Sequence, residues 1–437
     1  MKSNQGLKKV LIIAYYWPPS GGGGVQRWVK FAKYLKQFGW EPIVYAPENA
    51  DYPVIDESMG TDLPADLKVI RRKIWEPYAI YGKLSGSKDN KAHAGLISDG
   101  KKRSWLGERM LWIRGNWFIP DARKFWIKPS IRFLTKYLKE YPVDAIISTG
   151  PPHSMHVIAR GVKRKTGVKW VADFRDPWVH MDNNIEDLKY SARTLKKHED
   201  LEMSTLKEAD RVVTVSYTIV EDYEELSGRN VDLITNGFDY SDFNIDLKSI
   251  KKDKFIIGHY GTLGKYRNPK VLFQVLSDLC SENEAFAQKL VIQLAGTVDG
   301  SVISEINKTG LEDKLDLKNY LSHSESIELM AKSSLLLLLL DKNASMKGRM
   351  TGKIFEYLAT QNPILGLGYV KADPSRVLKA TQAGELIDYE DYDSIKKFVL
   401  DKFNNQENNQ IIDNSKLIEK YSRENLSKEL AELLDQL

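Results

Sequence analysis

Short continuous runs of apolar and β-branched residues alternate along the chain with segments that place apolar residues at helical spacing. Such runs are typical of strands buried in a parallel sheet, and the segments between them are typical of the amphipathic helices that cover it. A lysine-rich segment at 248–254 separates two series of predicted strands, and residues 50–100 are predicted to be irregular. The first series is 10–14, 43–46, 145–149, 170–173, 211–216 and 231–235, and the second is 255–260, 290–296, 315–320, 335–340 and 363–367.

Each series begins with a strand, a glycine-containing loop and a helix, which is the opening of a Rossmann-like domain. We therefore predict an α/β protein with two Rossmann-like domains, at 1–246 and 247–415, that face each other across a cleft. Residues 416–437 have the spacing of an amphipathic helix, and we expect this helix to return towards the first domain.

Composition narrows the class of protein. The single cysteine, Cys280, excludes an intrachain disulfide and a cysteine metal cluster. The polar first residues do not resemble a signal peptide, and the apolar run at 335–340 is too short to span a bilayer. We therefore expect a cytoplasmic protein. The net charge of +5 is small for 437 residues, so an electrostatic partner would have to bind a local patch.

Such a patch is predicted at 101–139, which contains eleven basic and two acidic residues with eight interleaved aromatic residues. This combination suits the inner face of the plasma membrane, where cations meet anionic lipid and aromatic rings lie at the interface. It also suits nucleic acid, whose bases stack on aromatic rings, or ordinary helices with buried aromatic and solvated basic residues. We predict contact with an anionic membrane surface and no nucleic-acid partner.

Candidate chemistry lies where the strands of the first domain end. A loop with four glycines follows the first strand, and it lacks the pattern of dinucleotide-binding proteins: Ala46 and Pro47 stand where an acidic residue would end the second strand. His153 follows the third strand, and Asp173, Arg175 and Asp176 follow the next. Because parallel strands end at one edge of the sheet, we expect these loops to converge on a ligand. The alternatives are a flexible glycine turn and a local ion-pair cluster around Arg175.

The second domain offers a place for an anion. The loop at 348–352 leads into a helix whose Lys353 and Glu356 lie one turn apart. Unpaired N–H groups at a helix start suit phosphate, a lysine can reach a diphosphate, and a carboxylate can accept from two ribose hydroxyls. The alternative is an exposed ion pair on an amphipathic helix.

Several motifs, in this order, resemble glycosyltransferase family 4, whose members are retaining enzymes of the GT-B fold, and here its bacterial cell-surface polysaccharide and lipopolysaccharide type. They are YYWPPSGGGGVQR, STGPPHS, DFRDPW, ADRVVTVS, ITNGFD, GTLGKYRNP and GKIFEYLATQNPILG. The resemblance implies transfer of a sugar from a nucleoside-diphosphate sugar to a glycan or lipid-linked glycan. It implies that the first domain is the acceptor side, that the second binds the nucleotide sugar, and that neither a metal nor a cofactor is needed.

The resemblance also implies roles for individual residues. The catalytic candidates are His153, Asp173, Arg267 and Lys353. The substrate-binding candidates are Gly22, Gly23, Gly24, Arg175, Asp176, Gly261, Lys265, Thr351, Gly352 and Glu356. One position departs from the pattern: Gly348 stands where the family often has a glutamate that contacts the donor sugar. The identity of the donor is therefore open.

Two other functions are compatible with the same motifs. Nucleotide-sugar 2-epimerases share the fold and the nucleotide site, but they need carboxylates that move a proton. A non-catalytic subunit of a polysaccharide-assembly complex would bind nucleotide sugar without turnover. Such a subunit would not need Arg267, Lys353 and Glu356 together, which favours the transferase.

Overall fold

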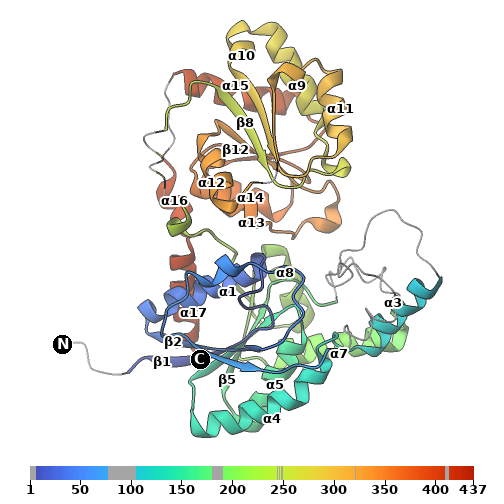
Figure 1. Cartoon of the computed structure of the whole chain (residues 1–437), viewed down its shortest axis with the longest axis vertical. Helices are drawn as coiled ribbons and strands as arrows, with labels where there is room; N and C mark the ends of the chain where they lie inside the picture. The colour runs from blue at the N-terminus through green and yellow to red at the C-terminus, as the bar shows by residue number, and fades with distance from the viewer. Residues whose placement is uncertain are drawn as a thin grey trace. The chain divides into compact units, whose positions relative to one another are not determined.

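The computed structural model describes residues 6–76, 105–179, 190–243, 245, 247, 250–319, 321–408 and 413–437. Its contacts divide the chain into two compact units (Figure 1): unit 1 is Met1–Thr235 with Leu426–Leu437, and unit 2 is Asn236–Asn425. The divisions thus lie at 235/236 and 425/426, where the sequence suggested 246/247 and 415/416. The first division comes earlier because Phe238 already pairs with Ser422 of unit 2.

Unit 1 is a parallel sheet with helices on both faces. Its strands are β1 (Lys8–Ile13), β2 (Trp40–Pro47), β3 (Lys68–Arg72), β4 (Ala145–Gly150), β5 (Lys169–Phe174), β6 (Arg211–Thr214) and β7 (Asp232–Leu233), in the order β3-β2-β1-β4-β5-β6-β7. Its α-helices are α1 (Gly23–Tyr34), α3 (Trp105–Trp117), α4 (Lys124–Glu140), α5 (Ser154–Thr166), α7 (Ala192–Glu208), α8 (Tyr217–Ser227) and most of α17 (Arg423–Asp435), and its 3₁₀ helices are η1 (Leu35–Phe38) and η2 (Glu57–Gly60).

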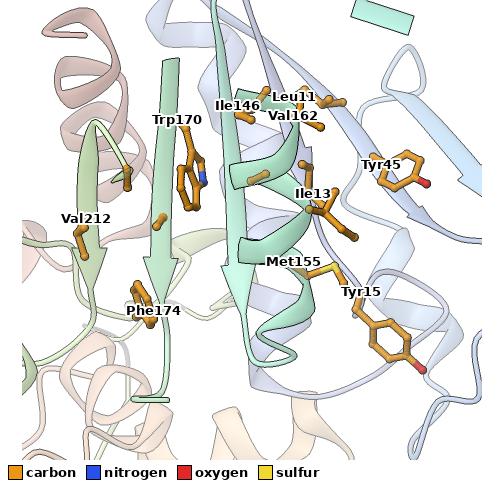
Figure 2. Packing of buried hydrophobic residues seen from close by; sticks show 14 of the residues in the cluster. Leu11, Ile13, Tyr15, Tyr45, Ile146, Met155, Val162, Trp170, Phe174 and Val212 are labelled. Carbon is orange, nitrogen blue, oxygen red and sulfur yellow. The ribbon is translucent and has the colours of Figure 1, made fainter. Parts of the chain in front are cut away.

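The strands of unit 1 are buried on both faces, as their continuous apolar runs predict. In β1, Leu11 and Ile13 join one core while Val10 and Ile12 join the core on the opposite face, because successive side chains of a strand alternate. Figure 2 shows the first of these cores, in which Met155 of α5 packs toward the sheet. The two cores hold both layers of helices on the sheet.

Helix α17 covers part of the second core. Its Leu426, Leu430 and Leu434 are buried in the cluster that also contains β1 residues. The Trp40 indole N–H donates to Asp435 Oδ1 at 3.2 Å, which fixes the end of the helix beside β2. Figure 1 shows α17 in red among the elements of unit 1. The last residues of the chain are therefore part of the first folding unit.

Unit 2 is a second parallel sheet, in the order β10-β9-β8-β11-β12-β13. Its strands are β8 (Phe255–Tyr260), β9 (Leu290–Ala295), β10 (Leu315–Lys318), β11 (Leu335–Leu339), β12 (Ile364–Leu367) and β13 (Gly384–Ile387). Its α-helices are α9 (Lys270–Glu282), α10 (Glu284–Lys289), α11 (Gly300–Lys308), α12 (His323–Lys332), α13 (Gly352–Ala359), α14 (Asp373–Thr381), α15 (Tyr392–Glu407) and α16 (Ser415–Glu419), and its 3₁₀ helices are η4 (Tyr240–Asp242), η6 (Lys265–Arg267), η7 (Glu312–Lys314) and η8 (Ala344–Met346).

The strand order reverses at an equivalent place in each sheet. In unit 1, β1 lies between β2 and β4, and in unit 2, β8 lies between β9 and β11. Loops that leave the carboxyl ends of strands on either side of such a reversal diverge, which leaves a ligand-binding crevice. The topology therefore predicts ligand binding at the loops after β1 and β4 in unit 1, and at those after β8 and β11 in unit 2.

The predicted α/β class with two Rossmann-like domains is confirmed, but two strands were missed. The prediction that 50–100 is irregular is wrong at β3, a partly exposed edge strand with only two apolar residues among its five. Strand β13 is also at an edge, and its first half is not buried. Residues 77–104 of the irregular segment, which include 101–104 of the basic segment, lie outside the described residues. None of the described helices combines the length and the apolarity needed to cross a membrane.

Candidate functional site

The loop after β1 brings the start of α1 against an arginine from the loop after β5. A Cβ atom on Gly24 would lie 1.6 Å from Nη1 of Arg175, so any other residue at position 24 would displace the guanidinium from this place. The Arg175 guanidinium donates from Nε and Nη2 to one oxygen of Asp176, Oδ2, at 3.1 and 2.7 Å. Gly22 and Gly23 are exposed, and Gly22 caps α1 without a side chain. The predicted glycine loop and the Arg175 loop therefore meet in space.

Asp173 lies beneath this meeting point, and its carboxylate is enclosed. It accepts hydrogen bonds from Nη2 of Arg27 at 2.9 Å, from the indole N–H of Trp28 at 3.1 Å and from the hydroxyl of Thr149 at 2.8 Å. Both Arg27 and Asp173 are 1% exposed, and Arg27 also donates to the carbonyl of Thr235. This arrangement suits an internal anchor for α1 better than a group that exchanges a proton with a substrate.

His153 lies immediately before α5, with its imidazole stacked on the indole of Trp178 at a centroid separation of 4.5 Å. Its Nδ1 atom is buried and has no hydrogen-bond partner among the described residues. Burial, assisted by His156, His198 and Arg175, lowers the pKa of His153 well below its ordinary value. The ring is therefore neutral near pH 7 and can donate through one nitrogen and accept through the other.

Two more histidines, which the sequence analysis did not single out, support this ring system. His156 shares a 2.8 Å hydrogen bond with the Ser148 hydroxyl, and burial lowers its pKa to about 3. The indole N–H of Trp178 donates to Nδ1 of His198 at 3.1 Å, so that nitrogen carries no proton. Trp178 is thus fixed at its edge by His198 and stacked on its face by His153. The histidine spacing is readable in the sequence, but the burial is not.

In unit 2, the loop after β8 lies against Lys353 of α13. Gly261 has φ of +127°, and a Cβ atom there would lie 2.3 Å from Nζ of Lys353. The backbone conformation favours glycine here, and the end of the Lys353 side chain occupies the space that a Cβ atom would take. Burial, with the charge of Arg267, lowers the pKa of Lys353. Below this lysine, His259 bonds through Nδ1 to the carbonyl of Leu337 at 2.9 Å, and burial lowers its pKa to about 4.

The start of α13 has unused hydrogen-bonding capacity. Thr351 is the N-cap residue, yet its hydroxyl makes no capping bond, and Oγ1 is buried without a partner among the described residues. The space around Gly352 is open, and that residue is exposed. A helix start attracts anions through its free N–H groups and its dipole. Thr351, Gly352 and Lys353 together form a place where a phosphate oxygen would satisfy groups that are now unpaired.

Glu356 lies one turn beyond Lys353, and the two are half-buried and form no ion pair within the described residues. Burial raises the pKa of Glu356, against the opposing effects of His323, Lys353 and Arg423. Both shifts go toward the neutral forms, because both charges lose water without gaining a close partner. This contradicts the alternative of an exposed surface pair.

Asp341, which the sequence analysis did not single out, holds the guanidinium of Arg267 in the loop after β8. Asp341, which follows β11, accepts from Nε and Nη2 of Arg267 at 3.2 Å each, and from Nη1 of Arg349 at 3.3 Å. Lys265 lies in the same loop but is exposed, with Nζ 4.7 Å from the ring centre of Tyr266. Gly348 stands in the turn before Arg349. No local pattern marks Asp341, because its partner Arg267 is 74 residues away.

The candidates thus form two clusters, one in each unit. Unit 1 brings Gly24 close to Arg175 and Asp176, with Asp173 buried below and His153 in the neighbouring loop. Unit 2 brings Gly261, Arg267, Thr351, Gly352, Lys353 and Glu356 to the start of α13, with Lys265 at its margin. Both carboxylates of the 173–176 segment already pair with guanidinium groups, which makes them unsuitable as metal ligands.

A scan against protein-family models finds no match, and neither does a search of curated proteins. Solved structures do match over both units. Sucrose-phosphate synthase from Thermosynechococcus elongatus is 11% identical with a TM-score of 0.57, and 98% of each chain is covered. TarM from S. aureus, in complex with fondaparinux, α-GlcNAc-glycerol and UDP, is 12% identical with a TM-score of 0.56, covering 98% of this chain and all of that one.

A third match is WaaG, described as a glycosyltransferase involved in lipopolysaccharide biosynthesis. It is 12% identical with a TM-score of 0.51, covering 97% of this chain and 99% of that one. At such identities a likeness establishes the fold and nothing finer. The predicted GT-B fold is confirmed by these matches and by the two parallel sheets.

The buried network around Asp173 predicts a stability difference between two neighbouring aspartates. Asp173→Ala leaves Arg27 buried without its counter-charge, and breaking such a pair costs about 3–5 kcal/mol. Asp176→Ala removes an exposed partner and is expected to cost less than about 1 kcal/mol. Urea unfolding followed by tryptophan fluorescence measures both. Equal losses of stability in the two variants would contradict the anchoring role of Asp173.

Proposed function

We propose that the protein is a retaining glycosyltransferase that moves a sugar from a nucleoside-diphosphate sugar to a glycan or lipid-linked glycan acceptor. The observation that carries this proposal is the cluster at the start of α13. There Lys353 is half-buried against Gly261, and among the described residues it forms no ion pair and the neighbouring Thr351 hydroxyl has no hydrogen-bond partner. A diphosphate supplies the negative charge and the acceptor oxygens that this cluster lacks.

The chemistry follows from where charge develops. Cleavage of the sugar–phosphate bond leaves extra negative charge on the departing diphosphate. Arg267, Lys353 and the N–H groups of α13 would stabilise that charge as it forms, because they are already oriented and partly shielded from water. Asp341 fixes the Arg267 guanidinium through two hydrogen bonds, so the cation need not reorganise during the reaction.

Glu356 is proposed to accept hydrogen bonds from the two ribose hydroxyls of the donor. Its position one helical turn from Lys353 suits a ribose attached to a diphosphate at the helix start. Hydroxyl donors would also stabilise the ionised carboxylate, which burial now disfavours. The donor sugar itself stays open, because Gly348 offers no side chain.

Unit 1 is proposed to receive the acceptor and the transferred sugar. The neutral, ring-stacked His153 can donate a hydrogen bond to a sugar hydroxyl without adding charge. Arg175 and the exposed glycines at the start of α1 would contact phosphate or acceptor groups. Asp173 is assigned here to positioning α1, because all of its near neighbours are hydrogen-bond donors within the fold.

We further propose that transfer proceeds without a metal ion, since cationic side chains and a helix start can stabilise the leaving group. The fondaparinux and α-GlcNAc-glycerol bound to TarM and the lipopolysaccharide role of WaaG support a function in surface-polysaccharide biosynthesis. The proposed place of reaction is the cytoplasm, at the inner face of the plasma membrane. A 2-epimerase is not favoured, because it would need a carboxylate free to move a proton, whereas Asp173 is buried and bonded.

The proposed function predicts turnover. Purified protein mixed with UDP- and GDP-sugars is expected to release nucleoside diphosphate when a glycan or lipid-linked acceptor is added. Lys353→Ala and Glu356→Gln are each expected to lower kcat/KM by about 100-fold or more, since each removes a contact to the donor. Release is followed with a coupled nucleotide assay.

Matched controls are Lys379→Ala and Glu385→Gln, which make the same changes at exposed residues of unit 2. Both are expected to keep wild-type rates. If the donor is epimerised when no acceptor is present, the protein is a 2-epimerase and the proposed transferase function is wrong. Nucleotide binding without turnover on any donor would favour the non-catalytic subunit instead.

A separate prediction concerns Asp341. Asp341→Asn keeps the shape of the side chain but loosens Arg267, and loss of orientation at a reacting group costs up to about 100-fold in rate. We expect kcat to fall at least tenfold, while the donor KM changes less than about threefold. Steady-state kinetics over a range of donor concentrations separates the two constants. An unchanged kcat would contradict the proposal that Asp341 positions Arg267.

A further inference from the structure

A groove in unit 1 lies outside the clusters described above. It runs between the segment that joins α3 to α4 and the side of α7, and it has a volume of about 520 Å³. Its apolar lining comes from Trp117, Ile119 and Leu201, and its charged lining comes from Lys124, Lys197 and Asp200. The groove therefore combines apolar residues with two lysines and one aspartate, and the aspartate pairs with Lys196.

Large aromatic side chains in the groove and beside its Lys124 remain in contact with solvent. Trp117 is 67% exposed, Trp75 is 54% exposed and Phe125 is 42% exposed. The rings of Trp75 and Phe125 are in edge contact, with centroids 4.6 Å apart. On α3, Trp112 and Ile113 are also exposed. Keeping this much aromatic and aliphatic surface in water is unfavourable, and contiguous exposed apolar surface usually marks an interaction site.

Neither lysine of the groove forms an ion pair with a carboxylate of the described residues. Lys124 donates to the carbonyl of Trp117 and lies 4.8 Å from the ring centre of Phe118 and 5.1 Å from that of Phe125. Burial lowers its pKa, and no carboxylate opposes this effect. Lys197 is exposed and forms no ion pair among the described residues, since Asp200 pairs with Lys196 at 3.0 Å.

The exposed face of α4 extends this charge. Phe125, Lys128, Arg132, Lys136 and Lys139 follow one another at intervals of three or four residues, and all are exposed. Residues at such intervals lie along one side of a helix. The stripe therefore starts at the aromatic rim of the groove and continues along α4 as four cations. An elongated surface of this kind suits an extended anionic partner better than a single small anion.

We propose that the groove binds the headgroup of an anionic phospholipid at a membrane surface. Lys124 and Lys197 contact the lipid phosphate, and Trp117, Trp75 and Phe125 enter the interfacial region of the bilayer. Both parts have a physical reason: indole and phenyl rings are stabilised at the membrane–water interface, and lysines are drawn to anionic lipid. A freely soluble anion would satisfy the lysines but leave the aromatic rim in water.

This proposal deepens the membrane location suggested under the proposed function, and it assigns that contact to defined residues. It does not require turnover, because lipid would bind unit 1 whether or not a sugar is transferred. A failure of lipid binding and a failure of glycosyl transfer are therefore distinguishable by two separate measurements on the same protein.

Flotation with vesicles tests the proposal. The protein is mixed with phosphatidylcholine vesicles, or with vesicles that also contain phosphatidylglycerol, and separated on a density gradient. We expect flotation only with phosphatidylglycerol. Each of Lys124→Gln and Lys197→Gln is expected to weaken partitioning about fivefold, and the double variant about thirtyfold. Trp117→Ala is expected to weaken it as well, and this loss persists in high salt.

Lys379→Gln, which removes an exposed charge in unit 2, serves as the control and is expected to float like the wild type. Circular dichroism and nucleotide release with a water-soluble acceptor verify that each variant is folded. Flotation that is equal on both vesicles, absent on both, or unchanged in the double variant would overturn the proposal. So would tight binding of a single-stranded oligonucleotide that depends on the same lysines.

Discussion

The end of the Lys353 side chain lies in the space beside Gly261 that a Cβ atom would take, and the donor cluster depends on this approach. It places an ammonium group at the carboxyl end of β8, where burial lowers the pKa of Lys353 and no carboxylate of the described residues forms an ion pair with it. Unit 1 also places a cation against a glycine, Arg175 against Gly24 at the start of α1, but there Asp176 pairs with the cation. In both units a glycine after the first strand makes room for a cation. A partly buried charge without a partner costs stability, and a bound anion recovers that cost.

Buried polar groups without hydrogen bonds near Lys353 also indicate that a ligand binds there. The hydroxyl of Thr351 and the Nε2 atom of His259 are buried without hydrogen bonds among the described residues, although most buried polar groups are satisfied. Both are on the β8 and α13 side of unit 2. By contrast, Asp173 is surrounded by donors. The hydrogen bonds that Asp173 accepts make it an internal anchor of α1, whereas the Thr351 hydroxyl at the start of α13 is left for a ligand to bond.

The sequence predicted the fold well because each central strand is a continuous apolar run, and it failed at the edges, where β3 and β13 are only partly buried. It also located the glycine loops and Lys353, since helix starts and glycines are visible locally. It could not show that Arg27 is buried, because an arginine on an amphipathic helix normally faces solvent. For that reason Asp173 looked like a site residue. Asp341 was missed because its contact with Arg267 joins two loops far apart in the chain.

The central claim is that the start of α13 binds a nucleoside diphosphate. A crystal structure of the protein with a bound nucleoside diphosphate tests it most directly. The account predicts phosphate oxygens within hydrogen-bonding distance of Thr351 Oγ1 and Lys353 Nζ, and ribose hydroxyls on the carboxylate of Glu356. A nucleotide bound elsewhere, with the Thr351 hydroxyl still unpartnered and Lys353 in contact with no phosphate, would contradict it.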